Sequence, residues 1–538
     1  MKQASAVLSM LHEQPEPRHS AARLFRDKPV LDWTLRRLQQ SKSVDRIAIL
    51  CWQDQADAVR PIAETHQAVI INKGPRSLIP AMDMVTTARR WADGWRGGLL
   101  QTCEFDRGFF APWLAEIANE LQTDPLVLID PAAGLVDAAL IDQIVEQANE
   151  HASRPLIFSQ AAPGLAGIAI RRSLLQQLSQ ANTHPGKFLH YQPAQPCRDA
   201  ISEPNCVSIP TPVARSTDRF TLDSPRQINR LSRLTEHLNG QLIGTSGEQL
   251  VQMRQQHTVA EDFPREIVLE LNTRRATKPI YLPAGQVNRP DLSLETARRI
   301  FSQIAAAEDI RLTLGGVGDP LLAEQCGPIV LAARESGISA IHVRTDLVDL
   351  TPQQIEQMID WPIDAISISI PAITARTYMA MMGVDALAKV LENVRKLVEI
   401  RWSRKRGTPL LVPVFVKCKQ NLGEMEVWYD KWLPTLGSAV ITGPSDYAGL
   451  IEDHSAADMT PPSRQPCRRL QSRMHILSEG QIVSCDQDVL GKHPMGQVDR
   501  DAISDVWMNQ LGVMRDNHAC GNWSAAPLCG SCKQWHRL

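Results

Sequence analysis

Short apolar runs alternate with amphipathic stretches along most of the chain, and this alternation restricts the possible fold more than any other feature. Short runs rich in Val, Ile and Leu are typical of buried strands. Longer stretches with apolar residues at helical spacing are typical of helices that cover a sheet. The alternation therefore predicts an α/β protein with parallel sheets. At about 150 residues per domain, the chain is long enough for three or four domains.

The first block of alternation spans residues 1–240 and predicts a Rossmann-like α/β domain. The expected strands are residues 6–11, 46–50, 68–71 and 126–129, with helices at 30–39 and 55–65 between the first three. Residues 190–225 are rich in Pro and Ser and poorly periodic. Residues 241–263 carry no strong core pattern and end near Pro264, so we expect a linker there.

The second block spans residues 264–457 and is more regular. The expected strands are residues 267–271, 311–314, 340–343, 365–370, 410–416 and 439–441, and the expected helices are 293–308, 329–335, 352–359, 385–401 and 423–432. Six consecutive strand–helix units predict a partial (β/α)6 barrel. In such barrels chemistry occurs at the carboxyl ends of the strands, so a site is expected in the loops that follow them.

Five of the 11 cysteines lie in the C-terminal segment, residues 458–538. Cys529 and Cys532 form a CxxC pair, and Cys467 and Cys485 flank a predicted hairpin whose tight turn would use Gly480. Pairing of the hairpin strands would bring these two thiols close together. Four thiolates suit either a [4Fe–4S] cluster or a structural zinc ion, and both alternatives are open at this point. Cys520 is a fifth thiol nearby.

Composition excludes several classes of function. Lys and Arg total 57 and Asp and Glu total 59, so the chain lacks the cationic surplus of a nucleic-acid-binding protein. No apolar run reaches the roughly 18–20 residues that a membrane span requires, so we expect no membrane partner. No export signal is evident at the N-terminus, which predicts a cytoplasmic protein. In that reducing compartment, clustered thiols indicate metal binding or catalysis.

The C-terminal segment resembles a SPASM domain. The matching stretches are CRRL at 467–470, GQIVSCDQD at 480–488, ISDVW at 503–507 and CGSC at 529–532. SPASM domains are C-terminal extensions of radical SAM enzymes that hold auxiliary iron–sulfur clusters. The resemblance is to the shorter form with one [4Fe–4S] cluster, and it implies four metal ligands: Cys467, Cys485, Cys529 and Cys532.

A loop in the second block resembles a radical SAM motif. The sequence GGVGDP at 315–320 follows the second expected barrel strand, where that family has a loop that meets the methionine amino group of SAM. The resemblance implies that Gly315, Gly316 and Asp319 bind the cofactor. Glycines let backbone carbonyls approach a ligand, and a carboxylate can receive an ammonium group. The alternative is an ordinary turn between a strand and a helix.

The defining CxxxCxxC motif of radical SAM enzymes is absent from the corresponding loop. Arg275, Pro279 and Leu282 occupy the three cysteine positions. Arginine is a permanent cation, and proline and leucine offer no ligand atom to iron. We therefore expect a degenerate barrel that has lost SAM cleavage, with SAM itself a doubtful cofactor. Arg275 and Lys278 belong either to a solvated basic loop or to a site for an anionic ligand.

The first block resembles sugar nucleotidyltransferases of the CMP-sugar synthetase type. The matching stretches are residues 6–8, 24–31, 44–50 and 164–169. In that family a glycine-rich loop after the first strand cradles phosphates, whereas residues 12–19 of this chain contain no glycine. The family's metal-binding aspartate corresponds to Asp130, for which a turn or helix cap is the alternative.

Three functional hypotheses follow from these patterns. The favoured one is an iron–sulfur protein with a SPASM domain on an inactive radical-SAM-like barrel, acting as a scaffold, an electron carrier or a maturation partner. Its partner would be a protein, a peptide or a redox protein. The second is an active enzyme of the radical SAM or nucleotidyltransferase type, so enzymatic activity is left open. The third is a zinc-stabilised structural protein.

Overall fold

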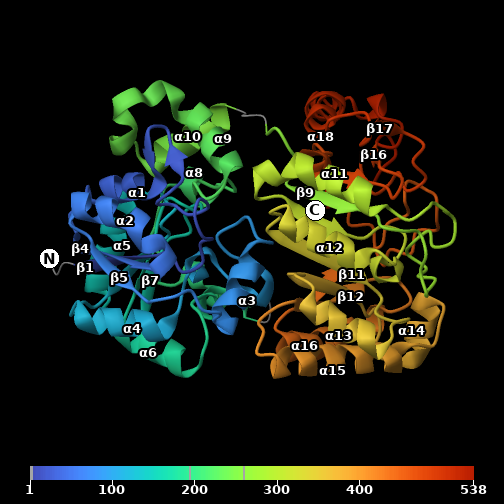
Figure 1. Cartoon of the computed structure of the whole chain (residues 1–538), viewed down its shortest axis with the longest axis horizontal. Coiled ribbons are helices and arrows are strands. Elements are labelled where there is room, and N and C mark those ends of the chain that lie inside the picture. The colour runs from blue at the N-terminus through green and yellow to red at the C-terminus, as the bar shows by residue number, and fades with distance from the viewer. Residues whose placement is uncertain (1–3, 193–194, 258–260, 538) are drawn as a thin grey trace. The chain divides into compact units, whose positions relative to one another are not determined.

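The computed structural model describes residues 4–192, 195–257 and 261–537, and the chain divides into two compact units, Met1–Ala260 and Glu261–Leu538 (Figure 1). Each unit contains a largely parallel sheet between helices, which confirms the predicted α/β class. The boundary lies inside the predicted linker 241–263, of which residues 258–260 are outside the described part. No helix among the described residues is both long and apolar enough to cross a bilayer.

The N-terminal unit has a six-stranded sheet in the order β5-β4-β1-β6-β8-β7. Its parallel strands are β1 (Ala4–Ser9), β4 (Val44–Cys51), β5 (Val69–Asn72) and β6 (Leu126–Ile129). The antiparallel edge consists of β8 (Ile168–Ile170) and β7 (Leu156–Phe158). All six residues of β1 are buried, because β1 lies inside the sheet and both its faces are covered.

Helices cover this sheet on both faces. Successive residues of β1 alternate between two apolar cores: Ala6 and Leu8 belong to one and Val7 to the other. The first core includes α1 (Val30–Leu38), α2 (Gln53–His66) and α5 (Ala138–Glu150), and the second includes α4 (Ala111–Glu120) and α6 (Arg172–Gln180). This alternation is the two-residue period of a strand, which places neighbouring side chains on opposite faces.

The predicted linker contains a helix of the N-terminal unit. Helix α10 (Gly247–Gln256) buries Leu250 and Val251 in the first core. The buried Arg37 of α1 holds the preceding segment, because its guanidinium donates to the carbonyl oxygens of Val136 and Thr245 at 2.7 Å each. The sequence pattern of residues 241–263 did not predict this contact, because few apolar residues supply the burial.

The C-terminal unit has a nine-stranded sheet in the order β14-β13-β12-β11-β10-β9-β15-β16-β17. The six predicted barrel strands are present and parallel: β9 (Glu266–Leu269), β10 (Arg311–Leu314), β11 (Ala340–Thr345), β12 (Ala365–Ser369), β13 (Leu410–Val416) and β14 (Val440–Thr442). The connecting helices include α11 (Leu294–Ile304), α12 (Cys326–Glu335), α13 (Pro352–Asp360), α14 (Ala375–Met382), α15 (Leu387–Ser403) and α16 (Met425–Leu436).

Local signals in the sequence set the ends of these helices. The Ser293 hydroxyl caps α11 by accepting from the amide of Thr296. Thr351 and Gln354 cap α13 reciprocally, with Pro352 at the first helical position. Gly437 ends α16 in a left-handed conformation at φ 74° that favours glycine.

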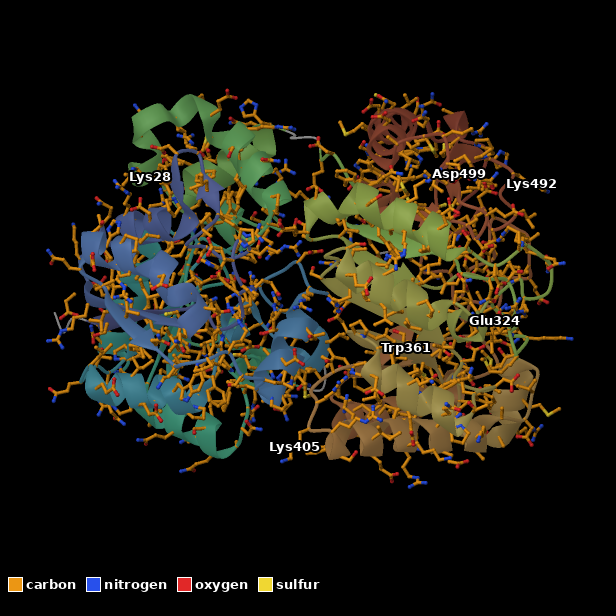
Figure 2. The ribbon with its side chains drawn as sticks, in the orientation of Figure 1. Lys28, Glu324, Trp361, Lys405, Lys492 and Asp499 are labelled. Carbon is orange, nitrogen blue, oxygen red and sulfur yellow. The ribbon has the colours of Figure 1, made fainter. Side chains whose placement is uncertain are left out.

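The predicted C-terminal hairpin extends the barrel sheet. Strand β15 (Arg473–Ile476) pairs in parallel with β9, and β16 (Gln481–Val483) and β17 (Pro494–Gln497) follow antiparallel. Gly480 has φ 77°, as expected for the tight turn. Figure 1 shows this red segment beside β9 and α11. Asp499, labelled in Figure 2, pairs with Arg299 of α11 at 3.2 Å.

Candidate functional site

The four predicted metal ligands line one small cavity of about 20 Å³. Cys467 immediately precedes α17 (Arg468–Ser472), and Cys485 follows β16. Cys529 and Cys532 lie in the C-terminal loop, where the amide of Cys532 donates to the carbonyl of Cys529 at 3.3 Å. Cys520 does not line this cavity and is exposed. The fold therefore gathers four thiols that are separated by as many as 65 positions.

Burial favours the protonated thiols of Cys485, Cys529 and Cys532 in the metal-free chain. Loss of hydration raises the pKa of Cys529 to about 12 and raises the pKa values of Cys485 and Cys532 as well. The amide of Gln534 donates to Sγ of Cys532 at 3.2 Å, a contact that favours the thiolate. Metal binding at these positions would release protons, because the thiolate is the ligand.

The donor set fits an iron–sulfur cluster. A zinc ion holds its sulfurs about 2.3 Å from one point, whereas a [4Fe–4S] cluster places four iron atoms between the thiolates. Within the described residues, no group of three or more His, Cys, Asp or Glu side chains is close enough to hold a single metal ion. The four cysteines line one cavity, and four thiolates suit an iron–sulfur cluster or a zinc ion.

Several residues besides the four cysteines stabilise the walls of this cavity. Arg464 donates to the carbonyl oxygens of Cys529 and Gly530, and its guanidinium stacks on Trp523 at 5.0 Å. Arg469 pairs with Asp486 at 2.5 Å. The amide of Cys467 donates to Nδ1 of the buried His518 at 3.2 Å. No local motif distinguishes these side chains, because each acts on a partner distant in sequence.

Arg275 stands at the first position where the radical SAM pattern has a cysteine, in the loop that follows β9. Its side chain is 6% exposed and pairs at 2.6 Å with Asp346, which is 1% exposed. Its Nε donates to the carbonyl of Val317 at 2.9 Å, and Nη2 donates to that of Gly318 at 3.0 Å. Arg275 is therefore not part of a solvated basic loop, although Lys278 is exposed.

The carboxylate of Asp319 accepts hydrogen bonds from neighbouring residues of the fold. Its carboxylate accepts from the amide of Leu321 at 3.1 Å, from the Thr345 hydroxyl at 2.8 Å and from the amide of Asp346 at 2.9 Å. Burial, followed by the charge of Asp346, raises the pKa of Asp319. These contacts match the alternative of a structural turn that caps the short helix Pro320–Leu322.

Gly315 and Gly316 make room for side chains of neighbouring strands. A Cβ at Gly315 would meet the side chain of Arg344 at 3.2 Å, and one at Gly316 would meet that of Glu270 at 2.9 Å. Pro279 and Leu282 stand at the other two cysteine positions of the radical SAM pattern. Pro279 is buried, and Leu282 lines a cavity at the same end of the barrel.

In the N-terminal unit, a guanidinium pairs with the aspartate that the resemblance implies as a metal ligand. Arg107 pairs with Asp130 at 3.2 Å and with Asp223 at 2.8 Å. Asp130 also accepts from the amide of Ala132 at 2.8 Å, as in the turn alternative. The sequence analysis identified neither Arg107 nor Asp223, because they join Asp130 only in the folded unit.

Comparisons with known proteins agree with the C-terminal geometry. Residues 467–533 match the family model of SPASM, described as an iron–sulfur cluster-binding domain. An uncharacterized protein of Treponema pallidum (strain Nichols) is 21% identical over 309 residues, which cover 54% of this chain and 82% of that protein.

Two solved structures are each similar to about half of the chain. Streptococcus suis SuiB bound to the precursor peptide SuiA is 13% identical with a TM-score of 0.40, covering 56% of this chain and 81% of SuiB. A cytidylyltransferase from Leptospira borgpetersenii serovar Hardjo-bovis (strain JB197) is 15% identical with a TM-score of 0.35, covering 48% of this chain and 99% of that one.

The segment that matches the SPASM model extends a parallel β/α sheet. The match at residues 467–533 confirms the resemblance found in the sequence.

Proposed function

We propose that this chain is an iron–sulfur scaffold protein whose barrel no longer cleaves SAM. One [4Fe–4S] cluster would be held by the four thiolates of Cys467, Cys485, Cys529 and Cys532. Such a cluster supplies one-electron redox chemistry when bound. The protein's contribution is the buried, cation-flanked cavity that these thiols line, with Arg464 and Arg469 fixing its walls.

The observation that carries the loss of SAM cleavage is the position of Arg275. Its guanidinium lies in the loop in which radical SAM enzymes hold their catalytic cluster. It donates hydrogen bonds to the carbonyl groups of Val317 and Gly318. Moving Arg275 away would break its ion pair with Asp346. This is unfavourable in free energy, since it leaves an unpaired buried charge. A SAM ammonium group would have to compete with Arg275 for these acceptors.

The proposed role is tested by anaerobic purification followed by iron, sulfide and zinc analysis. We expect about four irons and four sulfides per chain, as for one [4Fe–4S] cluster. With dithionite and SAM, 5′-deoxyadenosine should stay at the level of a blank. One zinc without sulfide would contradict the cluster. Deoxyadenosine formation that follows the protein through purification would contradict the inactive barrel.

A further inference from the structure

A second cavity, of about 160 Å³, lies at the carboxyl ends of β9, β10, β11 and β12. The hairpin strands β15 and β16 form its other wall. Its polar lining includes Arg344, Ser369, Tyr447 and His475. It far exceeds the roughly 10–15 Å³ that one water molecule needs, so it has room for a small molecule.

Arg344 is a weakly paired charge of this cavity. It pairs with Glu266 at 3.7 Å, and the same carboxylate is already bound by Arg473 at 2.8 Å and by the Thr313 hydroxyl at 2.8 Å. The Arg344 side chain is 44% exposed. Gly315 gives its aliphatic stem room to cross the loop.

The other charged groups in the described lining have closer partners. Glu270 pairs with Arg289 at 2.8 Å, and Asp486 pairs with Arg469 at 2.5 Å. Asp488 accepts from the amides of Lys492 at 3.0 Å and His493 at 2.9 Å, and Arg275 pairs with Asp346. Arg344 and Arg473 therefore share the carboxylate of Glu266, and Arg344 has the longer of the two contacts, 3.7 Å against 2.8 Å.

His475 adds a hydrogen-bonding group to the same wall. It is 6% exposed, and its Nε2 has no hydrogen-bond partner. Burial lowers its pKa to about 3, so the ring is neutral near pH 7 and can donate one hydrogen bond. A buried polar atom without a partner is unfavourable, and a ligand in the cavity would satisfy it.

We propose that this cavity binds a small molecule through an oxyanion group, a carboxylate or a phosphate, with the guanidinium of Arg344 as the principal contact. A planar guanidinium binds both groups with two parallel hydrogen bonds. An ammonium group is disfavoured, because Arg275 already uses the carbonyl groups of Val317 and Gly318. This site does not depend on the proposed cluster, although Cys485 lines both cavities.

Calorimetric titration of the full chain with inorganic phosphate and, separately, with malonate tests the site at constant ionic strength. We expect saturable binding of at least one probe, and the stronger probe identifies the class of oxyanion. Arg344→Met should weaken that binding at least tenfold. Arg298→Met, on the exposed side of α11 with a side chain 56% exposed, is the matched control and should bind as the wild type does.

A second measurement uses the unaltered chain, so its result does not depend on whether a variant folds. Phenylglyoxal modifies accessible arginines, and peptide mass spectrometry reports the rate at Arg344 in the unaltered chain. The bound probe should slow modification of Arg344 several-fold and leave Arg298 unaffected. The proposal is wrong if neither probe binds saturably, if Arg344→Met binds as tightly as the wild type, or if Arg344 is not protected. Repeating the titration with and without the cluster separates this result from that of the proposed function.

Discussion

At the scale of single residues, each unit has an arginine at, or paired with, a position for which the family resemblance implies a metal ligand. Arg275 bridges Asp346 and two carbonyl groups in the barrel, and Arg107 bridges Asp130 and Asp223 in the N-terminal unit. A guanidinium provides fixed positive charge and several directed hydrogen bonds without any need for a metal. Each arginine therefore forms a stable network of ion pairs and hydrogen bonds with its partners.

Replacing Arg275 with Met should destabilise the C-terminal unit. The change leaves the carboxylate of Asp346 buried without its cation, which costs about 3–5 kcal/mol of unfolding free energy. Urea denaturation followed by circular dichroism measures the effect. Arg274→Met is the control, since Arg274 is 56% exposed and its pair with Asp291 contributes little. The double variant Arg275→Met/Asp346→Leu should recover part of the loss. Equal stability of the two single variants would contradict the buried pair.

Glu13 should make the stability of the N-terminal unit depend on pH. Burial, followed by the charge of Asp130, raises the pKa of Glu13 from 4.5 to about 8. Between these values the folded state binds more protons than the unfolded state, so stability falls as pH rises, by at most about 1.4 kcal/mol per pH unit. Thermal melts between pH 5 and 8 should show a smaller loss for Glu13→Gln than for the wild type. The exposed Glu16→Gln should keep the wild-type slope, and an unchanged slope in Glu13→Gln would refute the buried acid.

At the scale of elements, the barrel and the cluster-binding segment share one sheet and one apolar core. Strand β15 pairs with β9, and Met474 and Ile476 are buried with Ile267 and Leu269. The loop that carries Cys529 and Cys532 has far fewer such contacts, and Trp523–Ala525 is its only described helical turn after α19 (Leu511–Ala519). The cluster is therefore expected to stabilise this loop more than the hairpin.

Cys485→Ser and Cys532→Ser should each abolish the absorbance near 400 nm. Limited proteolysis with mass spectrometry should then find new cleavage first in residues 520–537, because metal binding supplies the folding energy of this loop. The hairpin should resist longer, since its strands belong to the barrel sheet. Cys520→Ser should change neither property. Loss of colour in Cys520→Ser with retention in Cys485→Ser would mean that the ligand set is different.

At the scale of the whole molecule, each unit has its own apolar core. The cores of the N-terminal unit contain residues up to Val251, and the core of the C-terminal unit begins at Ile267. Separate cores of this size can unfold independently.

Scanning calorimetry of the cluster-loaded chain should therefore resolve two transitions. Removing the cluster should lower the midpoint of one transition, because a ligand stabilises only the unit that binds it. The Glu13→Gln variant should instead shift the other transition at pH 8. A single transition that responds to both changes would contradict two independent units.

The sequence by itself determined the six strands of the barrel and four strands of the N-terminal sheet, in their order. The strands at 126–129, 311–314 and 410–416 were predicted with their observed bounds, because short apolar runs flanked by turns permit few alternatives. The SPASM match was also predictable, since the cysteine spacing and the flanking residues form a family pattern, and the ligand role of the four cysteines stays a prediction. Helix α10 was missed, because its burial rests on two apolar residues and a distant arginine.

Only the tertiary structure decided what the charged residues do. Arg275 could have been solvated, and its burial against Asp346 follows from the approach of two loops 71 positions apart. The same holds for Arg107 between Asp130 and Asp223, and for Arg344 at the wall of the barrel cavity. Apolar periodicity is a local property, so the sequence alone shows it. Electrostatic partners are chosen by distance in space, which no local pattern encodes.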